Sequence, residues 1–317
     1  MLTTPSLHAV APRLRCPNCR SSVSAGDRSL ACPEGHSFDV ARQGYLTLPA
    51  PGKRIARGDT ASMVAARDAF LAGDHYRPIA NALAEAACQH RAGLAARAAE
   101  PIVVDIGSGP GYYLASVLRA LPGAWGVALD SSRPALVRAA GADRRIAAVR
   151  CDVWRELPVA SGGADLAINV FAPRNGAELA RVLAPEGALI VVTPTAHHLC
   201  ELIAAIGLLK VDPDKGTRLD AALVAHLQRH AHQQIEFELV LDHDEVWTLV
   251  AMGPSAHHLG GDELRRRVER LPTRVLLTGS VAVDTFVRRG RANPSASRPR
   301  TTAQSASAQP APRRSPP

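Results

Sequence analysis

Residues 102–113, IVVDIGSGPGYY, decide how this chain folds. The stretch begins as a short apolar run and ends in a helical pattern, so its glycines lie in a strand-to-helix turn. Gly107 and Gly109 let the backbone turn tightly and approach a ligand there, although several classes of nucleotide-binding protein share such a motif. The acid Asp105 precedes the glycines, which gives the D-x-G-x-G pattern of S-adenosylmethionine (SAM) methyltransferases rather than of NAD enzymes. We therefore predict that Asp105, Gly107 and Gly109 belong to a SAM site.

Short β-branched runs and helical patterns alternate on both sides of this stretch. We expect strands at 102–106, 125–130, 146–151, 165–171 and 188–193. Helices are expected between them, at 111–121, 133–140 and 175–183. Later segments predict two closing strands at 234–242 and 274–287, and helices at 199–209, 219–230, 243–252 and 261–270. Strands that alternate with helices predict an α/β fold, namely a Rossmann-like, mostly parallel, doubly wound sheet.

Two more acids lie where expected strands end. Asp130 closes the second strand, where the ribose hydroxyls of SAM would lie, and Asp152 ends the third, where an adenine contact is expected. A helix cap or a turn acid is the alternative for each residue alone. Three acids in register, Asp105, Asp130 and Asp152, favour a cofactor site.

The loop after the fourth expected strand reads NVFAPR over residues 169–174. Asn169 offers an amide, Phe171 a stacking face and Pro173, with Ala172, rigid carbonyls. Together these groups suit a planar base. A plain strand-to-helix turn remains the alternative.

A metal site is predicted near the N-terminus. Cys16, Cys19, Cys32 and His36 follow the spacing C-x2-C-x12-C-x3-H, with His8 as another candidate for the fourth ligand. Two short-spaced pairs held in turns supply the four ligands of a tetrahedral zinc ion. Since protein groups fill all four positions, we expect a structural zinc ion, and free buried thiols are the alternative.

Charge and composition divide the chain. The net charge is +8, residues 288–317 contribute seven arginines and no acid, and residues 1–67 hold nine basic and four acidic side chains. Basic ends suit binding to nucleic acid, although a solvated tail is an equally good interpretation of the C-terminus.

No apolar run of about 20 residues is present, and the N-terminus lacks a signal-peptide pattern, so we expect a cytoplasmic protein without a membrane span. We expect a disordered N-terminus at 1–12, a zinc-binding module at 13–50, a helical linker region at 51–100, a methyltransferase domain at 101–287 and a disordered basic tail at 288–317.

These motifs together resemble a known family. The zinc module, GHSFDVARQGYLTL, GDTASMVAARDAFLAGDHYRPI, VDIGSGPGYY and NVFAPRN are similar to the 23S rRNA guanine-N1 methyltransferases. The resemblance is greatest to the tylosin-resistance branch, which modifies guanine 748 in hairpin 35, whereas a sister branch modifies guanine 745. It covers residues 14–287 and excludes the tail.

The resemblance implies further site residues and a partner. It matches Tyr76, Tyr113, Leu114 and His198 to cofactor contacts of the family, although Asp74 stands where the family motif has Gly or Ser. It also implies binding of a 23S rRNA hairpin, a homodimer in which two zinc modules flank the RNA, and a contribution to macrolide (tylosin) resistance.

Guanine N1 carries a proton, so its methylation needs a general base. Candidates are Asp59, Asp152 and the carbonyls of residues 169–173, and spacing does not choose among them. Phe171 or Trp154 could stack a flipped base. Two other functions remain open: methylation of a small metabolite, and RNA binding by a non-catalytic zinc-ribbon protein.

Overall fold

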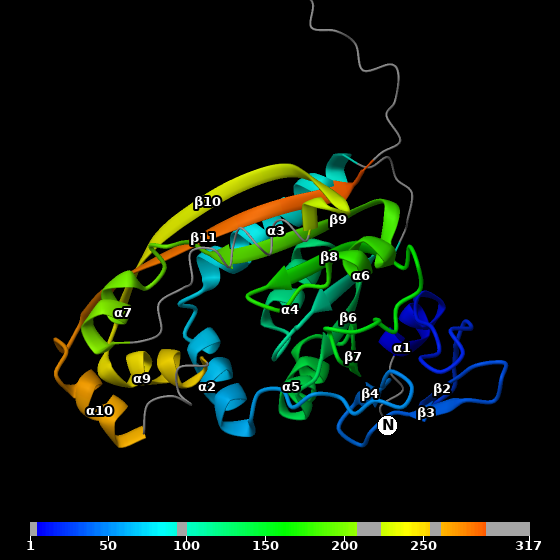
Figure 1. Ribbon diagram of the computed structural model, residues 1–317, viewed down its shortest axis with the longest axis horizontal. Helices are drawn as coiled ribbons and strands as arrows, with labels where there is room; N and C mark the ends of the chain where they lie inside the picture. The colour runs from blue at the N-terminus through cyan, green and yellow to red at the C-terminus, as the bar shows by residue number, and fades with distance from the viewer. Residues whose placement is uncertain (1–4, 94–99, 208–222, 254–260, 290–317) are drawn as a thin grey trace, which may run out of the picture.

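A computed structural model describes residues 5–93, 100–207, 223–253 and 261–289. An eight-stranded sheet with the order β10-β11-β9-β8-β5-β6-β7-β4 runs through it (Figure 1). Neighbours from β4 to β9 are parallel, and β11 is antiparallel to both β9 and β10. The strands are β4 (Tyr45–Thr47), β5 (Ile102–Ile106), β6 (Trp125–Asp130), β7 (Ile146–Arg150), β8 (Ala164–Val170), β9 (Leu183–Pro194), β10 (Leu227–Leu241) and β11 (Val275–Arg288). The predicted α/β sheet is thereby confirmed.

Helices pack on both faces of this sheet. Helices α3, α4 and α5 share one apolar core with the sheet, while α1 and α6 contribute to a second core on the other face. Their bounds are α1 (Pro5–Val10), α2 (Ala61–Ala72), α3 (Arg77–Gly93), α4 (Tyr112–Ala120), α5 (Arg133–Ala142), α6 (Gly176–Val182), α7 (Cys200–Ile206), α9 (His243–Ala251) and α10 (Gly261–Glu269). The region 51–100 is therefore no mere linker, because α3 is part of the first core.

The N-terminal module is joined to the main sheet. Its own small sheet contains β1 (Ser24–Ala25), β2 (Ser29–Ala31) and β3 (Ser37–Asp39). The next strand, β4, pairs in parallel with β7 at the edge of the large sheet. Leu14, Cys16 and Leu30 lie in the same apolar core as Val104 and Val149. The boundary expected at residue 50 thus does not separate two cores.

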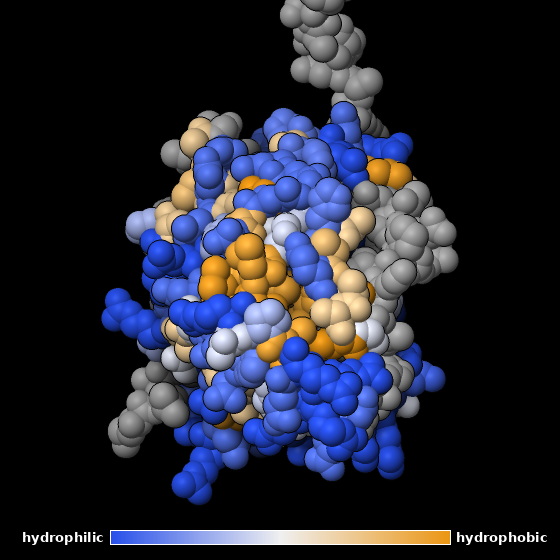
Figure 2. Space-filling model, turned by 90° about the vertical axis from the view of Figure 1, so that its left-hand side faces the viewer, coloured by the Kyte–Doolittle hydropathy of each residue, from blue (hydrophilic) through white to orange (hydrophobic). Residues whose placement is uncertain are grey.

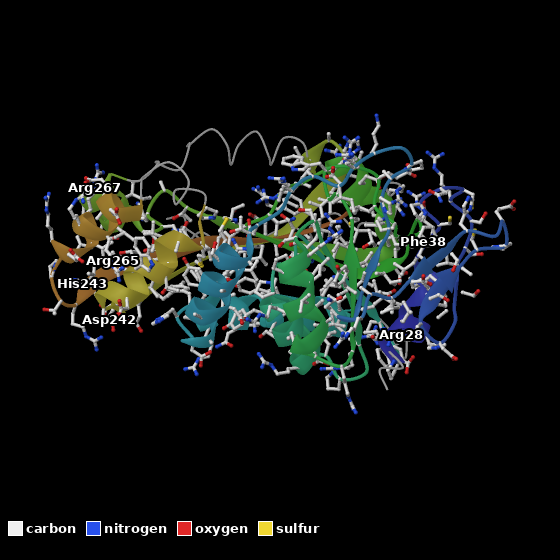
Figure 3. The ribbon with its side chains drawn as sticks, turned by 90° about the horizontal axis from the view of Figure 1, so that it is seen from below. Arg28, Phe38, Asp242, His243, Arg265 and Arg267 are labelled. Carbon is white, nitrogen blue, oxygen red and sulfur yellow. The ribbon has the colours of Figure 1, made fainter. Side chains whose placement is uncertain are left out.

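Seen from below, the molecule is elongated (Figure 3). Arg28 and Phe38 of the N-terminal module lie near one end, whereas Asp242, His243 and Arg265 lie at the other. Figure 2 views the end that carries α7 and α10, where hydrophobic side chains gather in a hollow ringed by hydrophilic ones.

Two expectations about local structure need correction, and a third lies outside the described residues. Residues 5–10 form helix α1 rather than a disordered N-terminus, because Leu7 and Val10 are buried against β6 and β7. The helix expected at 219–230 gives way to β10 from Leu227, which pairs with Arg288 of β11. Of the basic tail, residues 290–317 lie outside the described residues, so its expected disorder stays a prediction.

The conformation of the glycine loop requires a residue without a side chain at position 107. Gly107 has a φ of +76°, and a Cβ there would lie 2.5 Å from the Cβ of Ala172. The amides of Gly107 and Ser108 both donate to the carbonyl of Leu129 at the end of β6. The loop is therefore fixed between β6 and the loop that follows β8.

Candidate functional site

A cavity of about 590 Å³ lies at the carboxyl ends of strands β5 to β9. The chain continues from β5 to β6 on one side and reaches β8 on the other, so the strand order reverses at this point. Such switch points are where open α/β sheets bind ligands. The opposite wall comes from residues 56–59, Arg67 of α2, Tyr76 and Leu249 of α9. The predicted position of the site is thus the position of a real cavity.

Asp130 lines this cavity in a fixed orientation. Its Oδ2 accepts a hydrogen bond from the Gly109 amide at 2.9 Å, and its Oδ1 accepts one from the Ser132 amide at 2.8 Å. Burial raises the pKa of Asp130, while these two amides lower it in part. A carboxylate with two fixed oxygens can accept from a ligand diol through its remaining lone pairs.

Asp152 lines the cavity beside the exposed ring of Trp154. Its Oδ1 accepts from the Trp154 amide at 3.1 Å, and its Oδ2 accepts from Nε of Arg155 at the same distance. The acid therefore holds its own turn and still faces the cavity, and its contact with adenine stays a prediction.

Asp105 and Tyr113 carry polar atoms with no partner. Among the described residues, Oδ2 of Asp105 and the Tyr113 hydroxyl are buried without a hydrogen bond. Burial raises the pKa of Asp105 well above its usual range, and the charge of Asp130 adds to this effect. Buried polar groups are normally paired. Tyr113 lines the cavity, so its free hydroxyl fits a ligand that brings hydrogen-bonding groups of its own, as SAM does, whereas Asp105 is not among the described residues that line the cavity.

The side chain of Leu114 lies in the core and does not line the cavity. It is fully buried in the core, within reach of Gly126, and is not among the described residues that line the cavity. Its amide belongs to the first turn of α4, where helix N–H groups lack intrahelical partners. Only its backbone can take part in the expected contact.

In the loop after β8, some residues hold the loop in place and others face the cavity. Asn169 is fully buried and donates to the carbonyls of Ile106 and Pro173, each at 3.0 Å. Its amide thus holds the loop rather than facing the cavity, contrary to the expected contact with a base. Phe171 does line the cavity, is 41% exposed and has a φ of +52°, a strained value that is common at functional sites. Pro173 lines it too.

Asp59 reaches the cavity from the segment that precedes α2. Its carboxylate forms an ion pair with Arg67, whose other nitrogen donates to the carbonyl of Met252 at 2.9 Å. The Asp59 carbonyl accepts from the Ser132 hydroxyl at 2.8 Å. Asp59 therefore ties the segment to both walls of the cavity.

Tyr76 and His198 form a buried pair on the cavity wall. The Tyr76 hydroxyl and Nε2 of His198 are 3.1 Å apart. Burial lowers the pKa of His198 to about 4, so the ring is neutral near pH 7. Phe171 lies beside them, with its ring centre 5.8 Å from that of His198.

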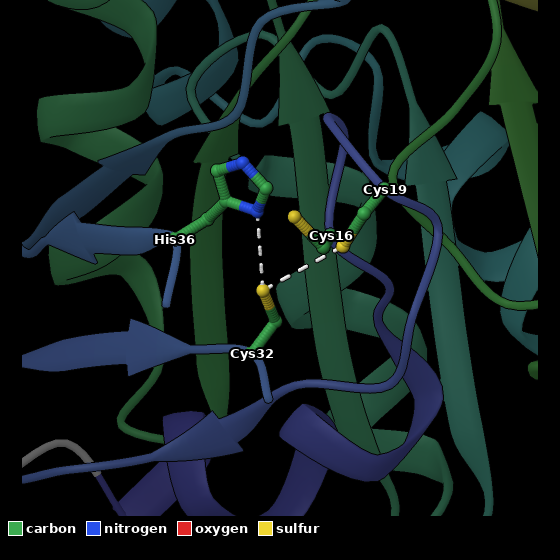
Figure 4. Close-up of side chains that lie close together, drawn as sticks. All are labelled: Cys16, Cys19, Cys32 and His36. Carbon is green, nitrogen blue, oxygen red and sulfur yellow. Dashed lines mark hydrogen bonds between the residues drawn. The ribbon is translucent and has the colours of Figure 1, made fainter. Parts of the chain in front are cut away.

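The predicted metal ligands come together at the N-terminal module (Figure 4). Ligand atoms of Cys16, Cys19, Cys32 and His36 all lie within 4.8 Å of one another. Sγ of Cys19 is 3.6 Å from Sγ of Cys32, and that sulfur is 3.3 Å from Nδ1 of His36. Zinc–sulfur bonds of about 2.3 Å place two sulfurs of a tetrahedron about 3.8 Å apart. The donor set and its spacing therefore fit structural zinc, and His36 rather than His8 is the fourth ligand.

The zinc-binding turn is attached to the wall of the cavity. Arg15 and Arg20 flank the first cysteine pair and form ion pairs with Glu156 at 2.7 and 2.9 Å. Glu156 lies two residues after Trp154, in the turn that follows β7. This contact is not predictable from the sequence, because acids and arginines so far apart along a chain follow no spacing rule.

A few other site residues also escaped the sequence analysis. Arg67 and Met252 line the cavity, and Ser280 of β11 donates from its amide to Nδ1 of His198 at 3.1 Å. Met252 and Ser280 lie outside every motif, and Arg67 lies within the stretch GDTASMVAARDAFLAGDHYRPI but was not singled out, so only the folded structure identifies their roles.

The fold and the cavity together define a Rossmann-like, SAM-dependent methyltransferase with an N-terminal zinc ribbon. Residues 14–54 match the zinc-ribbon family described as "RlmA, N-terminal". A relative from Streptomyces fradiae, the 23S rRNA (guanine(748)-N(1))-methyltransferase, is 47% identical over 82% of this chain and 91% of its own. A Micromonospora griseorubida relative, named for 23S rRNA guanine-N(1) methylation, is 48% identical over 85% of this chain and 95% of its own. The chain belongs to the 23S rRNA (guanine-N1)-methyltransferase family.

Among solved structures, the YcgJ protein from Bacillus subtilis is similar at 16% identity, with a TM-score of 0.42. That likeness covers 61% of this chain and 94% of the other. No helix of the described residues is long and apolar enough to span a membrane.

Substitution of a zinc ligand should remove the metal. We expect one zinc ion per wild-type chain, close to none in Cys19→Ser, and a lower melting temperature for that variant, since the module is too small to fold without a staple. Elemental analysis and calorimetry measure both quantities. Cys200→Ser is the matched control, because Cys200 is exposed and lies outside the cluster. Full zinc content in Cys19→Ser would exclude this site.

Proposed function

We propose that this chain methylates N1 of a guanine in 23S rRNA, the guanine at position 748 in hairpin 35, with SAM as methyl donor. The observation that carries the proposal is the cavity at the strand ends, with its glycine loop and acids, in a chain nearly half identical to enzymes named for this reaction. The zinc ribbon on the same sheet supports an RNA substrate, because it presents arginines on a rigid scaffold.

Cofactor binding is assigned to the wall around the glycine loop. Gly107 and Gly109 bring the backbone close to the ligand, Asp130 accepts from the ribose hydroxyls, and Asp152 contacts the adenine side. Asp105, Tyr113, the Leu114 backbone, Tyr76 and His198 complete the set carried over from the family. Bound SAM supplies a methyl group on positively charged sulfur that is already activated for transfer.

The residues of this chain then have to align the guanine, exclude water and accept the N1 proton. Phe171 and Trp154 offer exposed ring faces at the cavity for stacking a flipped base. Asp59 and Asp152 are the candidate bases. Each forms an ion pair with an arginine, Asp59 with Arg67 and Asp152 with Arg155.

We assign RNA binding to the N-terminal third, from the zinc ribbon to the segment before α2. Lys53, Arg54 and Arg57 are exposed there, and Arg57 also lines the cavity. Cations at the mouth of a cavity attract phosphates and lead a hairpin loop towards it. The arginines of residues 290–317 lie outside the described part of the chain and lack aromatic neighbours for base contacts.

Three further features stay predictions. A homodimer with zinc ribbons on either side of the hairpin follows from the family resemblance, and so does a contribution to tylosin resistance. A cytoplasmic location fits an rRNA substrate. Small-metabolite methylation and non-catalytic RNA binding are the two alternatives that the first experiment below separates from rRNA methylation.

Incubation with tritiated SAM and 23S rRNA from a strain that lacks this modification tests the function. We expect one methyl group per rRNA, and mass mapping should place it on N1 of guanine 748. Label in small molecules but not in rRNA would favour a metabolite enzyme. Binding to rRNA without any label would favour the non-catalytic alternative, and label at guanine 745 would correct the position.

Asp130→Asn should weaken SAM binding roughly ten- to a hundredfold, because a hydrogen bond to a charged acceptor contributes about 1.5–3 kcal/mol. Titration calorimetry with the SAM analogue S-adenosylhomocysteine measures the change directly. Asp68→Asn is the control, since Asp68 is an exposed acid on α2 that pairs with Arg138. Equal affinities in wild type and Asp130→Asn would remove Asp130 from the ribose site.

The double variant Arg54→Ala, Arg57→Ala should lower rRNA methylation and reduce the salt dependence of RNA binding, because two phosphate contacts are lost. Affinity for S-adenosylhomocysteine should change less than twofold. Arg119→Ala, an exposed arginine at the end of α4, serves as the control. If the double variant methylates rRNA like wild type at 150 mM salt, this surface does not bind the RNA.

A further inference from the structure

The buried Tyr76–His198 pair carries information about proton positions that neither residue gives alone. Nδ1 of His198 faces the backbone N–H of Ser280 at 3.1 Å. A backbone N–H can only donate, so Nδ1 must hold a lone pair. In a neutral imidazole the proton then lies on Nε2, and the Nε2–H donates to the Tyr76 hydroxyl oxygen 3.1 Å away.

The reverse arrangement is excluded. If the Tyr76 hydroxyl donated to Nε2, the imidazole proton would lie on Nδ1 and oppose the N–H of Ser280. A doubly protonated ring meets the same obstacle, and burial lowers the pKa of His198 to about 4, which disfavours that form near pH 7. His198 is therefore no general base, since one nitrogen accepts from Ser280 and the other already carries a proton.

Ser280 is held firmly enough to impose this choice. It is fully buried, and its carbonyl accepts from the amide of Thr195 at 3.1 Å. Its hydroxyl donates to Glu236 at 2.9 Å and lies 2.6 Å from the hydroxyl of Thr195. The register of β11 with β9 ends at Val281, so β9 does not use the Ser280 amide.

We infer that the Ser280 amide, acting through His198, holds the Tyr76 hydroxyl as a hydrogen-bond donor towards an acceptor oxygen of a ligand in the cavity. Tyr76 lines the cavity, and His198 is its hydroxyl's one partner among the described residues. Since the oxygen accepts from Nε2, its own proton is free for another acceptor. Burial also raises the pKa of Tyr76, so the hydroxyl keeps this proton.

This inference rests on the proposed function, which brings two acceptor oxygens into the cavity. One is the carboxylate of the methionine part of SAM, and the other is carbonyl O6 of guanine, which is conjugated to the N1 that reacts. Either oxygen would be bound in the same way, by accepting a hydrogen bond from a neutral donor that is shielded from water. In either case Tyr76 touches the ligand, whereas His198 acts through Tyr76 and is a positioning residue.

The test uses two variants of equal shape and opposite polarity. His198→Gln retains an N–H that can donate to Tyr76, whereas ionised His198→Glu can only accept and turns the hydroxyl proton away from the ligand. We expect His198→Gln to lie within a few-fold of wild type, and His198→Glu to match Tyr76→Phe, with a loss of roughly tenfold. Thermal melts confirm that each variant is folded.

Two readouts locate the acceptor. A loss of S-adenosylhomocysteine affinity in Tyr76→Phe, measured by calorimetry without RNA, assigns the carboxylate. Unchanged affinity with a lower kcat on rRNA assigns guanine O6. In the Tyr76→Phe background, exchanging Gln for Glu at position 198 should have no further effect on either quantity.

If His198→Gln and His198→Glu behave alike in a chain that retains Tyr76, the inference that His198 orients the Tyr76 hydroxyl is wrong. It is also wrong if Tyr76→Phe has wild-type affinity and kcat. A wild-type chain that binds S-adenosylhomocysteine but never methylates rRNA would instead refute the proposed function. In that case calorimetry with S-adenosylhomocysteine still tests whether His198 orients the Tyr76 hydroxyl. Failure of this inference and failure of the proposed function are therefore distinguishable.

Discussion

The close approach of the glycine loop to the loop after β8 is the constraint on which the site depends. Gly107 faces Ala172 with no room for a Cβ, and its amide is fixed to the carbonyl of Leu129. This contact sets the distance between the ends of β5, β6 and β8. Asp130 and Phe171 can therefore face one cavity only because position 107 has no side chain.

Zinc replaces a core that the N-terminal module is too small to build. Cys16 and Cys32 are nevertheless part of the apolar core beneath the main sheet, and β4 extends that sheet. Arg15 and Arg20 carry the attachment further, to Glu156 in the turn beside Trp154. The metal site and the cavity wall are thus held together by one continuous set of contacts.

The carboxyl groups of Asp59, Asp130 and Asp152 line the cavity, and this bears on which ligand it suits. Burial raises the pKa values of Asp105 and Asp130; the charge of Asp130 adds to the first shift, and that of Asp59 adds to the second. Arg67 offsets part of this charge through Asp59. A ligand with positively charged ammonium and sulfonium groups would relieve the rest, which is a reason for SAM rather than for an anionic dinucleotide to occupy these acids.

The sequence by itself determined the sheet, the zinc ligands and the position of the cofactor loop. Strand runs, the C-x2-C and C-x3-H pairs and the D-x-G-x-G turn are local patterns, so each is readable without the fold. Helix α1 is too short for its pattern to predict it, since its six residues contain one apolar pair at helical spacing, Leu7 and Val10. Only the tertiary structure decided that Asn169 supports its loop, that Glu156 ties the zinc ribbon to the cavity, and that Ser280 sets the proton positions of His198 and Tyr76. These contacts join residues far apart in the chain, and their hydrogen-bond directions depend on geometry that no spacing rule encodes.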